Sequence, residues 1–288
     1  MVRKYRLKGH GGFIMREGWF TKGLAAVAEC PDLFTKDKFY GADILGVGTA
    51  MGKSMRYWMT VCSLIEDKRG EGVVLTEFGQ LVLENDLYFE DIFTIWNMHK
   101  NIVMNVEKAT IFSLFFQEFN KGEFTKDQMM ERLQESLFRY TQEDEISERS
   151  FRDDCNTLLQ MYTELPEKNT DPEDKMKSVF SRLGLVRKTT YGYVKEEADI
   201  KKLPMEMVLV MLGDRLVKEG ISIDELLYKE NGVGKVLNLS RVALNEALDI
   251  LQGEGFIEVT RTAGLDMVYP TDKLCDSGQI IRNYYEKK

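Results

Sequence analysis

Apolar residues recur along most of the chain at steps of three and four, which is the spacing of helices with one buried face. Residues 45–59, LGVGTAMGKSMRYWM, show this pattern clearly. The apolar stripe that runs through them and just beyond is formed by Met51, Met55, Trp58, Met59 and Cys62. It predicts a helix that begins near Thr49, after a tight turn at Gly46 and Gly48.

A hairpin pattern follows this helix in KRGEGVVLTEFGQLVL, residues 68–83. A basic tip with two glycines precedes the β-prone triplet Val73–Leu75, and Thr76 begins a short helix. Helix, turn, helix and hairpin make up the winged-helix plan, in which the second helix commonly enters the major groove of DNA. Winged helices that contact only proteins have the same pattern, so both alternatives stay open at this point.

The same plan recurs near the C-terminus. Ser222 and Asp224 open one helix, Ser240 is placed to cap the next, and FIEVTRT alternates like a half-buried strand. The segment DMVYP can pair with that strand across a turn at residues 263–265. Acidic residues weaken the case for DNA contact by the second of these helices: Glu246, Asp249 and Glu254.

The residues between these two winged units are mostly helical in pattern. Aromatic side chains stand there at helical spacing: Phe93, Trp96, Phe112, Phe115, Phe116 and Phe119. Such a density is more typical of a core than of a base-stacking platform. The predicted fold is therefore mainly α with small β wings, with winged helix-turn-helix units at both ends of a helical middle. The predicted divisions are 1–87 (basic arm and winged helix), 88–165 (helical middle), 166–203 (polar linker and hairpin) and 204–288 (second winged helix).

Composition narrows the class of protein. Of 288 residues, 43% are hydrophobic and 30% charged, which is ordinary for a globular chain. No apolar run is long enough for a bilayer span, and the basic N-terminus lacks the apolar core of a signal peptide, so we expect a cytoplasmic protein without a membrane partner. The scattered cysteines, at 30, 62, 155 and 275, and only two histidines exclude a disulfide framework or a zinc site.

Charge is unevenly distributed along the sequence. The formal net charge is −8, yet residues 1–24 carry six Lys or Arg residues against the single acid Glu17. A basic arm of this kind can contact a phosphate backbone even when the rest of the chain is acidic, because the local field decides the contact. A merely solvated basic surface is the alternative that the charges alone favour.

Gly52-Lys53-Ser54 resembles the end of a phosphate-binding P-loop, but the rest of the motif is missing. The first glycine of the motif would stand at position 47, which is Val47. The preceding FTKDKFYGADI is charged and turn-like where a buried strand is required. We therefore expect no ATP site, and interpret the lysine as a DNA contact.

Basic and hydroxyl residues in the winged units and the N-terminal arm are the candidate nucleic-acid contacts. The arm contains GHGGFIMREGWFTKGL, in which glycines permit close backbone approach and arginine can bind phosphate with two donors. A docked N-terminal strand is an equal alternative for that stretch. The complete set of predicted contacts is Arg16, Lys22, Thr49, Lys53, Ser54, Arg56, Arg241 and Arg261.

Acidic and histidine residues supply the only candidates for catalysis, since no nucleophile–base pattern of trusted spacing occurs. YFEDIFTIWNMHK places Glu90 and Asp91 at a helix start and His99 two and a half turns later. With Asp153 and His10, these groups are the candidates for phosphodiester cleavage with Mg²⁺ or Mn²⁺, no other cofactor being evident. Helix capping and one half-buried histidine are the simpler explanation of the first cluster, and the residues alone favour it.

Several of these stretches together resemble a bacterial family catalogued as a domain of unknown function, DUF4007. They are GHGGFIMREGWFTKGL, LGVGTAMGKSMRYWM, LTEFGQLVLENDLYFEDIFTIWNMHK and FFQEFN, with weaker similarity continuing to RTAGLD at residues 261–266. The resemblance implies a double-stranded DNA-binding component of a phosphorothioation system for phage defence, one that supplies a nick. It implies as partners a sulfur-transfer enzyme, a cysteine desulfurase and an ATPase, and leaves a homo-oligomer open. A DNA-binding regulator and a protein-protein adaptor are the alternatives.

Overall fold

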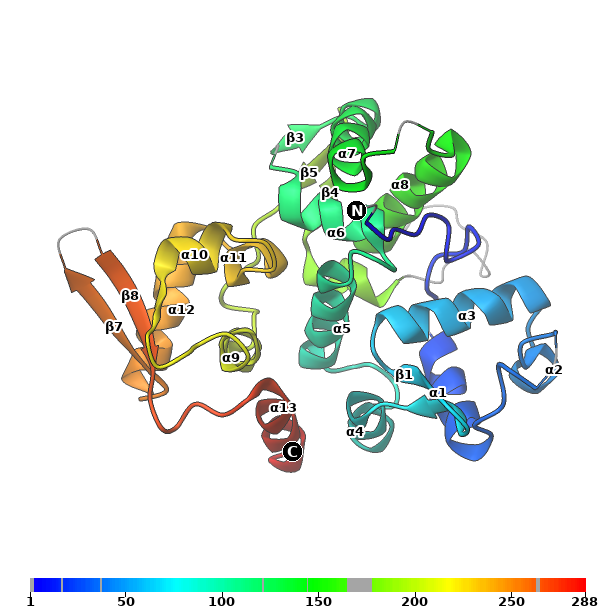
Figure 1. Cartoon of the computed structure of the whole chain (residues 1–288), viewed down its shortest axis with the longest axis horizontal. Coiled ribbons are helices and arrows are strands. Elements are labelled where there is room, and N and C mark those ends of the chain that lie inside the picture. Colours follow the sequence, from blue (N-terminus) through cyan, green and yellow to red (C-terminus); the bar gives the residue numbers. More distant parts are fainter. Residues whose placement is uncertain are drawn as a thin grey trace. The chain divides into compact units, whose positions relative to one another are not determined.

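Helices and three small antiparallel sheets make up the protein, in a computed structural model that describes residues 3–16, 18–36, 38–120, 122–143, 145–164, 178–262 and 265–288. The expected class, mainly α with small β elements, is confirmed. The chain forms two compact units, Met1–Glu196 and Glu197–Lys288, both drawn in Figure 1. The division into four segments stays a prediction, and most of the expected linker, residues 166–177, lies outside the described residues.

The first unit begins with four helices and a hairpin. They are α1 (Trp19–Glu29), α2 (Ala42–Leu45), α3 (Thr49–Val61), β1 (Ile65–Lys68), β2 (Gly72–Leu75) and α4 (Glu77–Asn85). The two strands pair antiparallel, with Ile65 opposite Leu75. Thr76 caps α4 by accepting a hydrogen bond from the backbone N–H of Gly79. The helix predicted from Thr49 and the hairpin after it are both confirmed.

Four longer helices and a three-stranded sheet complete this unit. They are α5 (Ile92–Met104), α6 (Thr110–Glu118), β3 (Glu123–Phe124), α7 (Lys126–Thr141), α8 (Glu148–Tyr162), a short 3-10 helix (Val179–Leu183), β4 (Val186–Lys188) and β5 (Tyr193–Lys195). Thr125 and Ser147 cap α7 and α8, as their place before an apolar stripe predicts. The six aromatic residues of the middle segment are all buried, so their interpretation as core is confirmed.

The second unit also combines helices with a small antiparallel sheet. It contains α9 (Met205–Gly213), β6 (Ile221–Ser222), α10 (Ile223–Tyr228), α11 (Val233–Val236), α12 (Arg241–Gly253), β7 (Ile257–Thr262), β8 (Leu265–Pro270) and α13 (Ser277–Glu286). Ser222 and Ser240 cap α10 and α12, as expected. The sheet has the order β6-β8-β7, with antiparallel pairing throughout. Two residues of the turn expected between β7 and β8, 263 and 264, lie outside the described residues.

Glycines determine how α2 meets α3. Gly46 ends α2 with a φ of 65°, a left-handed conformation that suits glycine, and Gly48 precedes the first residue of α3. Gly52 is buried in α3, where an added Cβ atom would come 2.8 Å from the carbonyl oxygen of Tyr40. The glycines of the P-loop-like stretch thus serve a tight helix–helix turn.

The N-terminal arm is bound to α8 through a buried histidine–carboxylate pair (Figure 1, dark blue). His10 Nδ1 accepts a hydrogen bond from the backbone N–H of Gly12, so Nε2 carries the proton and donates to Asp154 Oδ1 at 2.6 Å. The same oxygen accepts from the backbone N–H of Lys8 at 2.9 Å. Burial raises the pKa of the Asp154 carboxyl. The His10 ring also stacks on Trp58 of α3, which links the arm to that helix.

We expect the substitution Gly52→Ala to destabilise the first unit. In an exposed helix, alanine is more favourable than glycine by up to about 1 kcal/mol. Any loss of stability in Gly52→Ala therefore reports the clash with the Tyr40 carbonyl. Gly122→Ala is the control in the same unit, because nothing lies within 4 Å of its added Cβ atom. Urea unfolding should show a lower midpoint for Gly52→Ala and an unchanged or higher one for Gly122→Ala. Equal midpoints would refute the steric explanation.

Removing the acceptor for His10 should also cost stability. Asp154→Ala leaves the buried Nε2–H without its partner, and we expect the free energy of unfolding to fall by about 1–3 kcal/mol. Asp154→Asn keeps an amide oxygen that can accept from both His10 and Lys8, so it should lose less. The check is urea unfolding of the two variants side by side. Equal losses in both would mean that the carboxylate charge, rather than the acceptor, holds the arm.

Candidate nucleic-acid interface

Helix α3 leaves only one narrow stripe of its surface open. Most of its side chains are buried, among them Met55, Trp58 and Met59. Four accessible positions recur at steps of three and four: Ala50, Lys53, Arg56 and Thr60, with Thr49 and Met51 half-buried at the start of the helix. Because residues at these steps lie on one helix face, the stripe is continuous along α3. The predicted contacts Lys53 and Arg56 therefore lie side by side on it.

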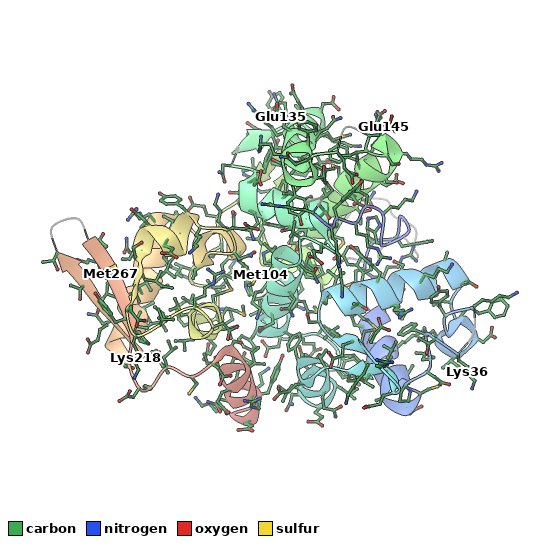
Figure 2. All side chains as sticks on the ribbon, in the orientation of Figure 1. Lys36, Met104, Glu135, Glu145, Lys218 and Met267 are labelled. Atoms are coloured by element: carbon green, nitrogen blue, oxygen red, sulfur yellow. The ribbon has the colours of Figure 1, made fainter. Side chains whose placement is uncertain are left out.

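This stripe forms one wall of a pocket of about 460 Å³, which we call the basic pocket. Its other walls come from the N-terminal arm, from Tyr40, and from the hairpin residue Asp67. Five cationic side chains line it: Arg6, Lys8, Lys53, Arg56 and Lys108. Asp67 is its single acidic lining residue. The side chains of the described residues are drawn in Figure 2. A pocket lined this way favours an anion.

Two of the five cations are positioned by aromatic rings. The Arg6 guanidinium lies 5.3 Å from the ring centre of Tyr57, and the Lys53 ammonium lies 4.9 Å from that of Tyr40. The Tyr57 hydroxyl donates to the backbone carbonyl of Lys108 at 2.9 Å, and burial raises its pKa. The hydroxyl thereby joins α3 to the segment that carries Lys108.

Two further cations are paired with carboxylates. Arg56 Nη2 lies 2.6 Å from Asp67 Oδ1, and Lys8 Nζ lies 2.6 Å from Asp153 Oδ2. The Arg56–Asp67 pair connects α3 to β1 of the hairpin. Asp67 is 64% exposed, so this ion pair is screened by water and contributes little to stability.

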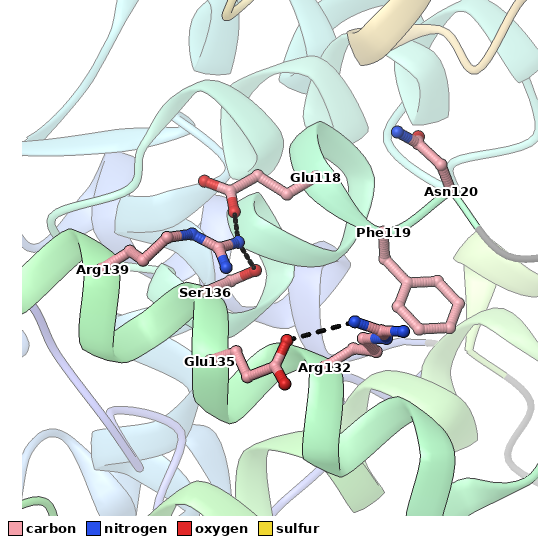
Figure 3. Close-up of a pocket in the computed structure, with 7 residues that line it drawn as sticks. All are labelled: Glu118, Phe119, Asn120, Arg132, Glu135, Ser136 and Arg139. Atoms are coloured by element: carbon pink, nitrogen blue, oxygen red, sulfur yellow. Dashed lines mark hydrogen bonds and ion pairs between the residues drawn. The ribbon is translucent and has the colours of Figure 1, made fainter.

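A second pocket, of about 390 Å³, lies where α6 ends beside α7 (Figure 3). Its charges are balanced within the pocket itself. Arg139 contacts Glu118 at 2.9 Å and also Ser136, while Arg132 contacts Glu135 at 3.3 Å. With each arginine paired to a carboxylate, this pocket has no excess of positive charge. The basic pocket is therefore the stronger candidate for binding nucleic acid.

Four of the predicted contacts in the first unit lie outside the lining of the basic pocket. Arg16 lies over the Trp19 ring at 5.8 Å, Lys22 is exposed on α1, and Thr49 is half-buried at the first residue of α3. Ser54 is fully buried, and its hydroxyl has no hydrogen-bond partner among the described residues. The structure thus removes Ser54 from the accessible contacts, because it faces the core from α3.

The two predicted contacts of the second unit are both paired with acids. Arg241 of α12 forms an ion pair with Asp224 and lies 5.9 Å from the Tyr228 ring centre. Arg261 of β7 lies 2.6 Å from Asp249. Each guanidinium is therefore neutralised within the unit, and this surface lacks the positive excess of the basic pocket.

The candidate acid–base residues do not form one cluster. Asp91 caps α5 by accepting from the backbone N–H of Phe93, and Glu90 is exposed next to it. His99 is fully buried, with Nδ1 2.7 Å from the Tyr162 hydroxyl, and therefore cannot reach a DNA strand in this conformation. The expectation of a half-buried His99 is wrong because α5 lies inside an aromatic core.

The remaining two candidates, His10 and Asp153, lie beside the basic pocket. Both nitrogens of His10 are used in the buried network that holds the arm, which leaves no ring atom for proton transfer. Asp153 is partly exposed and contacts Lys8 of the pocket wall. Across the described ranges, no three His, Cys, Asp or Glu side chains are grouped to hold a metal ion.

Sequence reasoning did not single out three cations of the basic pocket. Arg6 and Lys8 were included only as part of the excess positive charge of residues 1–24. Lys108 gave no signal, since it lies in a short segment between two apolar helices. Only the folding of that segment against Tyr57 brings it to the pocket.

Solved structures of similar fold provide an independent comparison. A structure described as "Magnesium ion-bound SspB crystal structure" matches with a TM-score of 0.82 and 18% identity, and one described as "SspB crystal structure" with 0.81 and 19%. Each match covers 99% of this chain and 89% of the other chain. No curated protein matches the sequence. Among the described residues, no helix has the length and apolarity that crossing a bilayer requires.

The family comparison covers almost the whole sequence. The profile described as "Protein of unknown function (DUF4007)" matches residues 7–285, which covers nearly all of both units and four of the five cations of the basic pocket, Arg6 lying just before it. The resemblance that the sequence motifs indicated is confirmed by this match. The chain belongs to the DUF4007 family.

Proposed function

We propose that this protein is the DNA-binding component of a DNA phosphorothioation system that defends bacteria against phage. The basic pocket is the observation that carries the proposal, because five cations against one carboxylate favour a phosphate backbone. Similarity of fold to SspB over 99% of the chain supports the choice of pathway. The partners in this proposal are double-stranded DNA, a sulfur-transfer enzyme, a cysteine desulfurase and an ATPase, all in the cytoplasm.

Both units are, in this proposal, winged helices. In the first, α1, α2 and α3 precede the β1–β2 hairpin, and in the second, α9 to α12 precede β7 and β8. The order β6-β8-β7 joins a short strand after the first helix to the wing, which supports this assignment. Helix α3 would then be the DNA-recognition helix of the first unit and β1–β2 its wing.

The two units differ in the partner that their charges favour. In the second unit the guanidinium groups of Arg241 and Arg261 are already paired with acids, whereas Val242 of α12 is 77% exposed. Exposed apolar side chains between acidic ones are more typical of protein contacts than of DNA contacts. The second unit would therefore be the adaptor of the protein, and the first unit the part that holds DNA.

The proposal also includes a specific activity, the nicking of DNA. Asp153, next to Lys8 of the basic pocket, and the exposed Glu90 are the acids that remain accessible. The described residues do not group three ligands for Mg²⁺ or Mn²⁺, so we derive no step through a metal. Magnesium sites often use one or two carboxylates and the phosphates of the substrate, and Asp153 would be the carboxylate in that role.

DNA binding tests the main proposal through its salt dependence. Lys53→Ala should weaken binding to duplexes of any sequence and reduce the slope of log K against log salt by about one unit, because one phosphate contact is lost. Arg132→Ala is the control, since it removes a positive charge from the balanced second pocket. Fluorescence anisotropy across a salt series measures both. An identical slope for wild type and Lys53→Ala would exclude Lys53 from the interface.

A plasmid assay tests the nicking proposal. Wild-type protein with Mg²⁺ or Mn²⁺ should convert supercoiled plasmid to the relaxed form, and Asp153→Asn should lower that rate at least about tenfold without loss of DNA binding. The nicking rate of Glu90→Gln in the same assay shows whether Glu90, the second accessible acid, takes part in the reaction. Plasmid that stays supercoiled with wild type would contradict nicking by this chain alone, while the anisotropy data would still decide whether it binds DNA.

A further inference from the structure

We propose that the basic pocket binds the terminal phosphate of a DNA strand, of the kind exposed at a nick, and that Asp67 is its internal counter-ion when no strand end is bound. This inference rests on the proposed DNA-binding function and specifies the group that the pocket recognises. Three features of the pocket carry it: its enclosure, its excess of charge, and the ion pair between Arg56 and Asp67.

Enclosure is the first of these features. A duplex presents a long convex backbone, with one charge per about 1.7 Å of helix axis. The basic pocket instead has a volume of about 460 Å³, within the range of sites that enclose small ligands. The accessible stripe of α3 is part of its wall, and residues of the arm, Gly9 and Gly11, lie on another side. A hollow of this size can receive one projecting group at a point where a bound backbone ends.

The second feature is the amount of positive charge. Five cations and one carboxylate line the pocket, and Asp153 beside it neutralises Lys8, so three positive charges remain in excess, more than the single negative charge of an internal phosphodiester balances. A phosphate monoester carries about −1.5 to −2 charges at neutral pH and offers three strong acceptor oxygens. The Arg56 guanidinium can bind two of these oxygens at once, and lysine ammonium groups such as that of Lys53 can contact the third.

The third feature is the carboxylate that already occupies part of the pocket. Asp67 Oδ1 lies 2.6 Å from Arg56 Nη2, which is the position that a phosphate oxygen would take. The pair is partly exposed, with Asp67 64% and Arg56 27% accessible, so its net stability is small and a dianion can replace it. Asp67 also belongs to β1, so its release would remove one of the links between the hairpin and α3.

The decisive experiment compares two nicked duplexes that differ in one group. One carries a phosphate at the nick and the other a hydroxyl, with 5′ and 3′ positions tested separately. Wild-type protein should bind the phosphorylated nick about tenfold more tightly at one of these positions, the effect of one or two charge-assisted hydrogen bonds. Arg56→Ala and Lys53→Ala should remove this preference. Arg132→Ala, which alters a charge in the second pocket, should keep it.

A second pair of variants tests the role of Asp67. Asp67→Asn frees Arg56 and should raise affinity for the phosphorylated nick about threefold or more, whereas Glu66→Gln removes the same charge from the neighbouring exposed residue of β1 and should change it less. Equal effects of Asp67→Asn and Glu66→Gln would overturn the counter-ion role, because only general charge would then matter.

The outcomes separate this inference from the proposed function. Tight but equal binding to the two nicks would overturn the strand-end site while DNA binding stands. Absence of binding to either duplex would overturn both. Inorganic phosphate at matched ionic strength provides the last comparison. If millimolar phosphate raises the melting temperature of wild type and abolishes binding to both nicks equally, the pocket binds free phosphate and the strand-end assignment is wrong. A preference that persists in phosphate supports it.

Discussion

The hydrogen bond between His10 and Asp154 is the constraint on which the candidate site depends. It is buried, and it holds a glycine-containing arm against α8 while the histidine ring stacks on Trp58 of α3. A buried histidine N–H without an acceptor would lower the stability of the fold. The hydrogen bond to Asp154 therefore favours the observed position of the arm. That position puts Arg6 and Lys8 opposite the open stripe of α3. A core interaction thus sets the spacing of surface cations that would otherwise repel each other and separate.

The packing of α3 likewise fixes the cations on the opposite wall of the basic pocket, Lys53 and Arg56. Because seven of the thirteen residues of that helix are buried, its orientation is fixed by the core, and beyond its first turn the stripe with Lys53 and Arg56 faces the pocket. Aromatic rings then limit where two cations lie, Tyr40 for Lys53 and Tyr57 for Arg6. Positioned cations lose less side-chain entropy when an anion binds than freely moving ones do. This preorganisation distinguishes the pocket from a solvated basic surface.

Periodicity predicted the elements well because helices α3, α7 and α8 each bury one regular face and begin at a recognisable cap or turn. It failed where tertiary contacts decide exposure. Ser54 lies next to Lys53 in sequence, yet it faces the core, and only the packing of α1 and α2 around α3 could reveal this. His99 has the residue type of an acid–base group, but the surrounding aromatic rings enclose it completely.

Lys108 shows why the site could be predicted only in part. Sequence patterns identify residues that share one helix or one hairpin, whereas the basic pocket combines α3, the arm and a turn between α5 and α6. Charge shows the same dependence on folding. The chain carries a net −8, so its overall charge repels DNA, yet the fold gathers five cations around one small volume. At a contact, the local field outweighs the distant acids, because salt screens charges beyond about 8–10 Å. In the proposed function, the basic pocket therefore binds nucleic acid although the net charge of the chain is negative, and that negative charge opposes nonspecific binding.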